Sequence, residues 1–301
     1  MYISLVQIVN IRGENTLDNK TSIVIAVLLT AMVCIAGTYV LAGGNERNSQ
    51  ATLYVAGSTT VEPLMVSFQE EYEKYVNVTL NVTAQGSGTA APALRNGTAS
   101  IGMLSRDINS SESDLIPLVI ARDGVVIVVD KRSGITDLTL EQLAKIYNKE
   151  YTNWNQVGGN NLTISPIVRE AGSGTRDCID TLMAASLGIR AADFVFTGFP
   201  EMHTGGSMLT QIYNTTGGIG YVNLGSLRDV DSSLTVVKID GVMPGVEVVL
   251  DNTYELSRDL LLATIGQPTG HVEFFFHWIM SPDGQKIVEK EGFVPIGATS
   301  W

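Results

Sequence analysis

Short apolar runs alternate with stretches of helical periodicity along most of the chain. The apolar runs at 53–55, 78–83, 116–121, 124–129, 164–168, 218–222 and 234–239 predict strands. Helical patterns at 61–75, 139–147, 176–187, 205–214, 255–265 and 270–280 predict helices between them. The run 124–129 is apolar on both faces, which is typical of a buried strand. Strands and helices in alternation predict an α/β protein.

A separate apolar segment lies near the N-terminus. Residues 22–44 carry no charge, and this length is sufficient to span a bilayer. We expect an uncleaved transmembrane anchor, and a signal removed near Ala42-Gly43 is the alternative. A tail of residues 1–21 precedes the segment and a polar linker of residues 45–51 follows it. The expected location is the cell membrane, with the rest of the chain outside the cytoplasm.

Composition excludes one class of partner and leaves the others open. The formal net charge of −12 argues against nucleic-acid binding, because phosphate backbones require a basic surface. An anion ligand remains compatible with this charge, since buried donors act at contact while exposed charges are screened over about 8–10 Å. A hydrophobic content of 45% over 301 residues is sufficient for one large or two modest domains.

The candidate chemistry is an anion site built at helix N-termini. Gly57-Ser58-Thr59-Thr60 and Gly86-Ser87-Gly88-Thr89 each follow a predicted strand and precede a predicted helix. The first turn of a helix has unpaired N–H groups that attract an anion, and the hydroxyls add neutral donors. No Lys follows the last Gly of either motif, so a nucleotide-binding P-loop is not expected.

The stretch from Arg169 to Arg176 supplies a third such element. Ala171-Gly172-Ser173-Gly174 lets the backbone approach a ligand closely, and a helix is predicted to start there. Arg169 adds a planar guanidinium that suits oxyanion oxygens. Three elements of this kind in one chain favour a single site for a small tetrahedral oxyanion.

These motifs carry a resemblance to the substrate-binding proteins of phosphate ABC transporters. The similarity extends from about residue 52 to 296 and includes, in the order of the family, the segments 57–63, 85–89, 101–106, 138–143, 152–154, 169–175, 218–222, 281–286 and 292–295. It implies a two-lobe periplasmic-binding-protein fold of type II with a two-strand hinge, here preceded by the N-terminal transmembrane helix. The crossings between lobes are expected near 128–134 and 234–241. Lobe one would comprise 52–130 plus 240–301, and lobe two 131–239.

The resemblance also implies a function and a set of ligands. The family binds inorganic phosphate in the cleft between the lobes and delivers it to an ABC permease and ATPase for import. The positions that match the family's phosphate ligands are Thr59, Thr60, Thr89, Ser105, Arg106, Arg169, Ser173, Gly174 and Thr175. From this resemblance we expect a monomer that uses no cofactor or metal and that is not an enzyme.

One position departs from the family pattern. Many members have an Asp directly after the residue equivalent to Ser105, where it accepts the proton of hydrogen phosphate. Here Arg106 follows, with Asp107 after it. Arg106 either contacts the anion or forms a structural pair with a carboxylate, and both alternatives stay open. The selectivity for phosphate over sulfate or arsenate stays open with them.

Two other classes of function remain as alternatives. One is a sensor or surface protein that binds an oxyanion without transport. The other is a phosphatase-like hydrolase with Ser173, His203 and an Asp, although the sequence around Ser173 lacks the first Gly of Gly-x-Ser-x-Gly. The lone thiol downstream of the apolar segment, Cys178, is expected to be a small packed side chain rather than a nucleophile.

Overall fold

A computed structural model describes residues 50–194 and 198–297. The predicted tail, the apolar segment 22–44 and nearly all of the linker lie outside the described residues. Within the described part, no helix has the length and apolar character needed to cross a membrane. The expectation of an N-terminal anchor therefore stays a prediction.

The first sheet is built from both ends of the described chain. Its strand order is β2 (Val78–Ala84), β1 (Ala51–Gly57), β3 (Ile101–Leu104), β11 (Ser257–Ile265) and the first half of β4 (Leu115–Asp130). β1 runs parallel to β2 and β3, while β11 is antiparallel to β3 and β4. The associated helices are α2 (Glu62–Tyr72), α3 (Ala90–Arg95), α8 (Gly270–Ile279) and α9 (Pro282–Lys290). Phe68 packs edge-on against Phe275 within this core.

The second group of strands comes from the middle of the chain. The second half of β4 pairs with β9 (Gly218–Asn223) and β10 (Leu234–Ile239), and these pair with β6 (Ser165–Pro166) and β5 (Asp137–Leu138). β7 (Val168–Arg169) and β8 (Glu201–Met202) form a separate ribbon. The helices of this part are α4 (Leu140–Tyr147), α5 (Gly174–Ser186), α6 (Gly205–Asn214) and α7 (Val246–Leu250). Short 3₁₀ turns complete the described chain: η1 (Ser87–Thr89), η2 (Ser110–Glu112), η3 (Lys131–Ser133), η4 (Trp154–Val157), η5 (Ala191–Asp193) and η6 (Leu224–Asp229).

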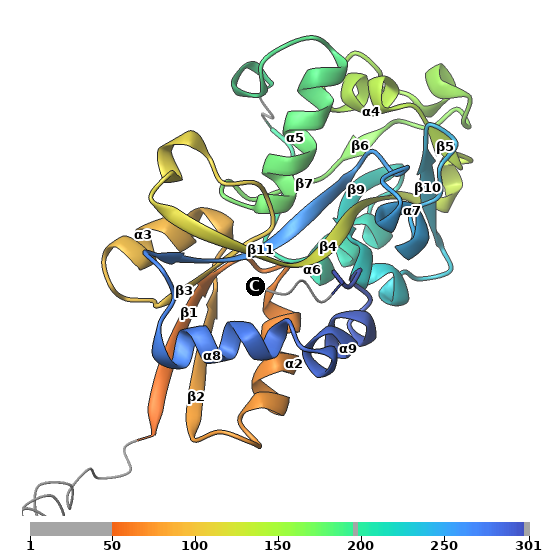
Figure 1. Ribbon diagram of the computed structural model, residues 1–301. Coiled ribbons are helices and arrows are strands. Elements are labelled where there is room, and N and C mark those ends of the chain that lie inside the picture. Colours follow the sequence, from red (N-terminus) through yellow and green to blue (C-terminus); the bar gives the residue numbers. More distant parts are fainter. Residues whose placement is uncertain (1–49, 195–197, 298–301) are drawn as a thin grey trace, which may run out of the picture. The chain divides into compact units, whose positions relative to one another are not determined.

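β4 connects the two parts, as Figure 1 shows. It pairs with β11 as far as Gly124 and with β9 from Val125 onward. The return occurs just before β11, because Val249 and Leu256 still pack in the core of the middle part whereas Leu260 packs in the first core. The change of pairing after Gly124 and the change of core between Leu256 and Leu260 differ from the crossings expected near 128–134 and 234–241.

The helix predicted at 255–265 is wrong, because this segment is the strand β11. Its run Leu260–Ala263 is apolar on successive positions, which does not by itself separate a buried strand from a buried helix. Pairing on both edges with β3 and β4 decides the outcome. The remaining predicted helices are present, and the runs 116–121 and 124–129 form one continuous strand.

Candidate functional site

Three loops from the first part and one helix start from the second meet in a buried cluster. β1 ends at Gly57, whose φ of 138° is favourable for glycine, and the chain then turns into Ser58 and Thr60. A Cβ at Gly57 would overlap the main-chain oxygen of Met103, so β1 and β3 end close together. This brings the loop after β1 beside the loop after β3, which carries Ser105.

The hydroxyls of this cluster form a hydrogen-bonded network. Ser58 Oγ accepts the N–H groups of Thr60 at 3.1 Å and Val61 at 3.3 Å, so both of its lone pairs are used. It therefore donates its proton to Ser105 Oγ at 3.0 Å. Ser87 Oγ accepts the Ser105 N–H at 3.1 Å and lies 3.2 Å from Ser105 Oγ. Main-chain amides thus fix the direction of the Ser58 hydroxyl, while either Ser87 or Ser105 can donate in the contact between their hydroxyls.

The start of α5 meets this cluster from the other side. Thr175 Oγ1 lies 3.0 Å from Thr60 Oγ1, and both side chains are buried. A Cβ at Gly174 would overlap the hydroxyl oxygens of Ser87 and Ser105, so only glycine permits this approach. Because these contacts join residues on either side of the crossings, the described structure has the two parts in contact.

Arg169 of β7 contacts the loop after β1 through Thr59, next to the cluster. Its side chain is 3% exposed and forms an ion pair with Glu170 at 2.9 Å. Its Nη2 donates to Thr59 Oγ1 at 2.8 Å and to the main-chain oxygen of His203 at 2.9 Å. One arginine therefore bridges the loop after β1 and the segment after β8.

A second buried arginine, Arg258, lies at the start of β11. It donates to Asp123 Oδ2 through Nε at 3.0 Å and Nη2 at 2.7 Å. The same guanidinium donates to the main-chain oxygen of Ser105 at 2.9 Å and to Thr175 Oγ1 at 3.0 Å. Burial raises the pKa of Asp123, while the Arg258 charge opposes that rise. Arg258 contacts both sides of the cluster from the crossing strand.

Arg106 takes the structural-pair role that the sequence left open. Both Nη atoms donate to Glu112, at 2.7 and 2.8 Å, and Nε lies 3.1 Å from Asp177 Oδ2. These hydrogen bonds hold the pKa of Glu112 below its ordinary value. Asp107 is exposed and lines the polar cavity next to Arg106. Arg106 therefore ties η2 to α5.

The structure gathers part of the predicted set around one centre. Thr60, Ser105, Gly174 and Thr175 meet, and Thr59 joins them through Arg169. Two other predicted residues form hydrogen bonds within their own segments. Thr89 Oγ1 donates to the Gly86 oxygen at 2.9 Å. Ser173 Oγ accepts the Arg176 N–H at 3.4 Å and thereby caps α5. Sequence reasoning missed four buried members of the network, namely Ser58, Ser87, Asp123 and Arg258. Ser58 and Ser87 lay within the quoted motifs, so their hydroxyls could have been added.

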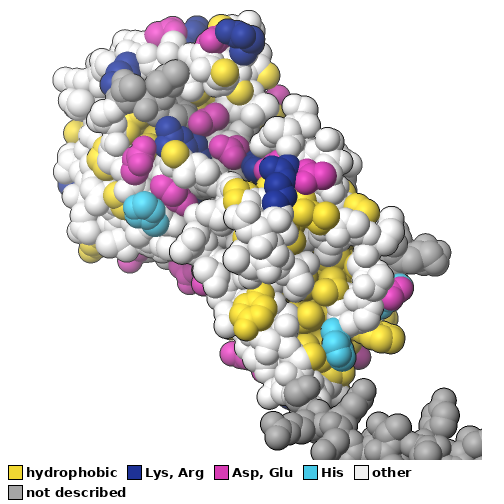
Figure 2. All heavy atoms as spheres, turned by 90° about the vertical axis from the view of Figure 1, so that its left-hand side faces the viewer, with side chains coloured by type: hydrophobic (Ala, Val, Ile, Leu, Met, Phe, Trp, Pro, Cys, Tyr) yellow, Lys and Arg dark blue, Asp and Glu magenta, His cyan; other side chains and the backbone are white. Residues whose placement is uncertain are grey.

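This arrangement is suited to binding an anion. Hydroxyl donors, the N-terminus of the 13-residue helix α5 and arginines converge where water has little access. Each buried arginine is paired with a carboxylate, and this pairing offsets part of the free-energy cost of removing its charge from water. Basic and acidic side chains also lie side by side on the face drawn in Figure 2. On this face, the acidic side chains are therefore mixed with basic ones.

Two further groups bear on chemistry near the cluster. Cys178, one turn into α5, is partly buried and packs against the second core. Burial raises the pKa of its thiol to about 11, so it is protonated at neutral pH. Within residues 50–194 and 198–297, no group of three or more His, Cys, Asp or Glu side chains is arranged to hold a metal ion.

Comparison with known proteins agrees with this geometry. The model of the PBP superfamily domain matches residues 43–283. The phosphate-binding protein PstS of Borreliella burgdorferi is 29% identical over 88% of this chain and 97% of its own length. PstS of Bacillus subtilis is 27% identical over 92% of this chain and 95% of its own length.

Solved structures agree with the same assignment. A Clostridium perfringens protein with bound phosphate superposes with a TM-score of 0.74 at 31% identity, covering 81% of this chain and 99% of the other. An ABC-type phosphate transport receptor from Vibrio cholerae gives a TM-score of 0.69 at 29% identity, covering 81% of this chain and 100% of the other. The chain therefore belongs to the PBP superfamily, and its predicted resemblance to the substrate-binding proteins of phosphate ABC transporters is confirmed.

Proposed function

We propose that this protein binds inorganic phosphate between its two lobes, outside the cytoplasm, and delivers it to an ABC permease with its ATPase for import. The observation that carries the proposal is the buried hydroxyl network of Ser58, Ser87 and Ser105 facing the start of α5. The relatives named above, which are phosphate-binding proteins, support the choice of phosphate among oxyanions.

The proposed ligand groups come from both lobes. Their members are the predicted Thr59, Thr60, Ser105, Arg169, Ser173, Gly174 and Thr175, to which the buried hydroxyl network adds Ser58 and Ser87. The predicted Thr89 and Arg106 are left out, because Thr89 Oγ1 donates to the Gly86 oxygen and Arg106 pairs with Glu112. An anion held by both lobes makes contacts that only the closed state offers, so it shifts the equilibrium toward closure. The permease then reads closure as the presence of cargo.

The lobe boundaries are part of the proposal. The sequence division assigned 52–130 plus 240–301 to lobe one and 131–239 to lobe two. The change of strand pairing after Gly124 and the packing of Leu256 favour a hinge formed by β4 and the chain entering β11. We further propose that residues 22–44 anchor a monomer to the membrane.

The alternatives have less support. A hydrolase would use Ser173 as a nucleophile, but Ser173 Oγ caps α5 and His203 meets Arg169 through its main-chain oxygen. An oxyanion sensor without transport would use the same site, and the presence of permease and ATPase genes beside this gene would favour transport.

Calorimetry of the full-length chain in detergent tests the ligand. Titration with phosphate, sulfate, arsenate and molybdate should give one phosphate site per chain and tighter binding of phosphate than of sulfate. Tighter binding of sulfate or molybdate would assign the protein to another oxyanion. If none of the four anions gave a measurable heat of binding, the result would contradict the proposal.

A further inference from the structure

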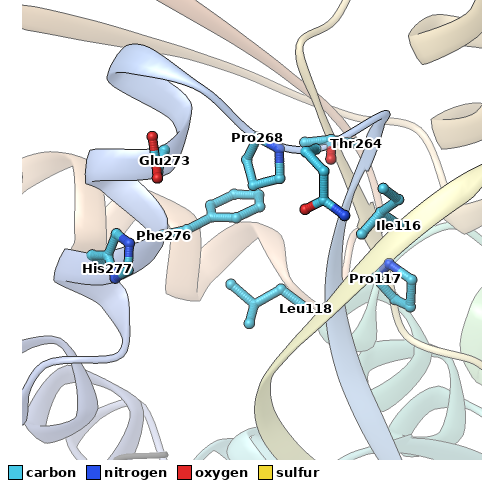
Figure 3. A pocket seen from close by; sticks show the side chains of 9 residues that line it. Ile116, Pro117, Leu118, Thr264, Pro268, Glu273, Phe276 and His277 are labelled. Atoms are coloured by element: carbon cyan, nitrogen blue, oxygen red, sulfur yellow. The ribbon is translucent and has the colours of Figure 1, made fainter. Parts of the chain in front are cut away.

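Among the described residues, two parts of the first sheet are left open. One is an apolar pocket of about 210 Å³ between α8 and the first residues of β4, into which the ring of Phe276 projects (Figure 3). The other is the outer edge of β2, which is the last strand in the order of the sheet. The sequence around β2 also contains a motif that indicates what covers this edge.

β2 has the features of an edge that would pair with a strand of another molecule. It keeps a regular register with β1 from Val78 to Ala84, without a bulge, and it contains no charged residue and no Pro. Natural edge strands use charges, Pro or bulges to prevent such pairing. Leu80 N–H points to the open side and donates to Glu73 Oε1 at 2.7 Å, so one edge group is covered. The N–H of Val82 points the same way, because backbone groups alternate along a strand.

Sequons for N-glycosylation, Asn-x-Ser/Thr, are more frequent here than chance predicts. Residues 51–301 contain 12 Asn, and about one residue in six is Ser or Thr, so about two sequons are expected. Six are present, and the Asn of each is exposed: Asn77, Asn81, Asn96, Asn109, Asn161 and Asn214. Two of them lie at the edge strand, one just before β2 and the other within it.

Asn81 lies on the exposed face of this edge strand. Leu80 and Val82 face the core, so the side chains of Asn81 and Thr83 lie on the other face. Tyr54 of β1 is directly opposite Asn81 and is 51% exposed. Because neighbouring strands are about 4.8 Å apart, a sugar on Asn81 Nδ2 can pack its C–H groups on the Tyr54 ring. A bulky, hydrated glycan at this position keeps a second strand away from the edge.

We propose that the exported protein is N-glycosylated at Asn77 and Asn81, and that these glycans cover the open edge of β2. The proposal rests on the location outside the cytoplasm that belongs to the proposed function. The co-reactant is an oligosaccharide linked to a polyprenyl phosphate or diphosphate. A bond forms between the Asn Nδ2 and C1 of the sugar, and the bond between C1 and the phosphate oxygen breaks. The lipid phosphate or diphosphate leaves, and Nδ2 releases one proton.

Glycopeptide mass spectrometry of the full-length protein, purified from its own organism, tests the modification. Trypsin cleaves after Lys74 and Arg95, and the peptide 75–95 contains both sequons of the edge. Fragmentation that preserves the sugar should locate a glycan on Asn77 and another on Asn81. Peptide 133–145, which contains no Asn, should have its unmodified mass. An unmodified Asn81 would overturn the proposal, whatever the state of Asn77.

Three substitutions of Thr83 separate the sugar from the edge. Thr83→Ser keeps the sequon, so this variant should keep the Asn81 glycan and sediment as a monomer in detergent. Thr83→Ala removes the sequon, so it should lose the glycan and shift to dimers and larger species. Thr83→Lys also removes the sequon, but its charge should keep the bare edge monomeric. A monomeric Thr83→Ala protein, or equal self-association of the Ala and Lys variants, would contradict the role of the glycan at the edge.

Phosphate calorimetry on the same samples separates this proposal from the proposed function. All three variants should keep the wild-type phosphate affinity, because Thr83 is not a member of the anion cluster, and this result also verifies that they are folded. A glycosylated Asn81 in a protein that binds no phosphate would contradict the proposed function and support the cover of β2. Phosphate binding by a protein with an unmodified Asn81 would do the reverse.

Discussion

Arg258 and Asp123 lie directly opposite each other on β11 and β4, and two guanidinium nitrogens donate to one oxygen of Asp123. The other Asp123 oxygen accepts the N–H of Leu224 at 2.9 Å, just after β9. This pair lies where β4 changes its pairing partner and where the chain returns to the first sheet. From there, Arg258 contacts Ser105 on one side and Thr175 on the other. It is therefore placed to couple the hinge to the anion cluster.

Replacing Arg258 by Lys should weaken phosphate binding about tenfold or more. Lysine keeps the charge but loses the planar fork that reaches Asp123, Ser105 and Thr175 together, and a hydrogen bond to a charged group is worth roughly 1.5–3 kcal/mol. Arg122→Lys is the matched control, because Arg122 lies on the same pair of strands and contacts Val249 and Asn252 instead. Calorimetry should show little change for the control. Equal losses in both variants would indicate a general effect on the strands.

Arg169→Ala should weaken phosphate binding by about one to two orders of magnitude, since a charge-assisted hydrogen bond is worth roughly 1.5–3 kcal/mol. The change also leaves Glu170 without its partner, so thermal denaturation must confirm that the variant is folded. Arg169→Lys should recover part of the affinity, because the charge remains and the fork does not. Wild-type affinity in the alanine variant would place the anion elsewhere.

The selectivity against sulfate separates the roles of Arg106 and Asp107. Arg106→Ala should weaken phosphate and sulfate alike, because it releases Glu112 and Asp177 next to Ser105 and α5. Asp107→Asn should leave the ratio of the two affinities nearly unchanged, since Asp107 is exposed. Competition binding measures both ratios. A large rise in sulfate affinity for Asp107→Asn alone would instead make Asp107 the acceptor for the ligand proton.

Asp180 on α5 gives the stability a pH dependence. Burial raises the pKa of this carboxyl to about 8, although Arg176 lies 3.5 Å away and opposes the rise. The folded protein therefore binds more protons than the unfolded chain between about pH 4 and pH 8, and the free energy of unfolding falls across this window as the pH rises. Asp180→Asn should remove this part of the decline, so its melting temperature relative to wild type should increase from pH 5 to pH 8. Asp229→Asn, at an exposed position, should keep the wild-type slope. A wild-type slope in Asp180→Asn would contradict the assignment.

Local patterns predicted most elements and several residues of the candidate cluster, while long-range pairing decided the rest. The Gly-Ser/Thr motifs could be found because each one sits at a strand end followed by a helix start. Arg258 could not be found in this way, since a charged residue beside an apolar run is more often exposed, and its burial depends on Asp123 far away in sequence. The same long-range pairing made the segment 257–265 a strand and moved the return crossing toward residue 256. Arg106 was left with two roles because the distance to Glu112 depends on how η2 folds back.

Phosphate calorimetry on the full-length chain with Gly174→Ala tests the central claim most directly. The added Cβ would overlap the hydroxyl oxygens of Ser87 and Ser105, so the two lobes should fail to close around the anion. Gly206→Ala is the control, because no atom lies within 4 Å of a Cβ at that helix start. We predict one phosphate site per chain in the wild type and in Gly206→Ala, and a loss of at least about a hundredfold in affinity for Gly174→Ala. Unchanged phosphate affinity in a folded Gly174→Ala protein would contradict closure of the lobes on the anion at this site.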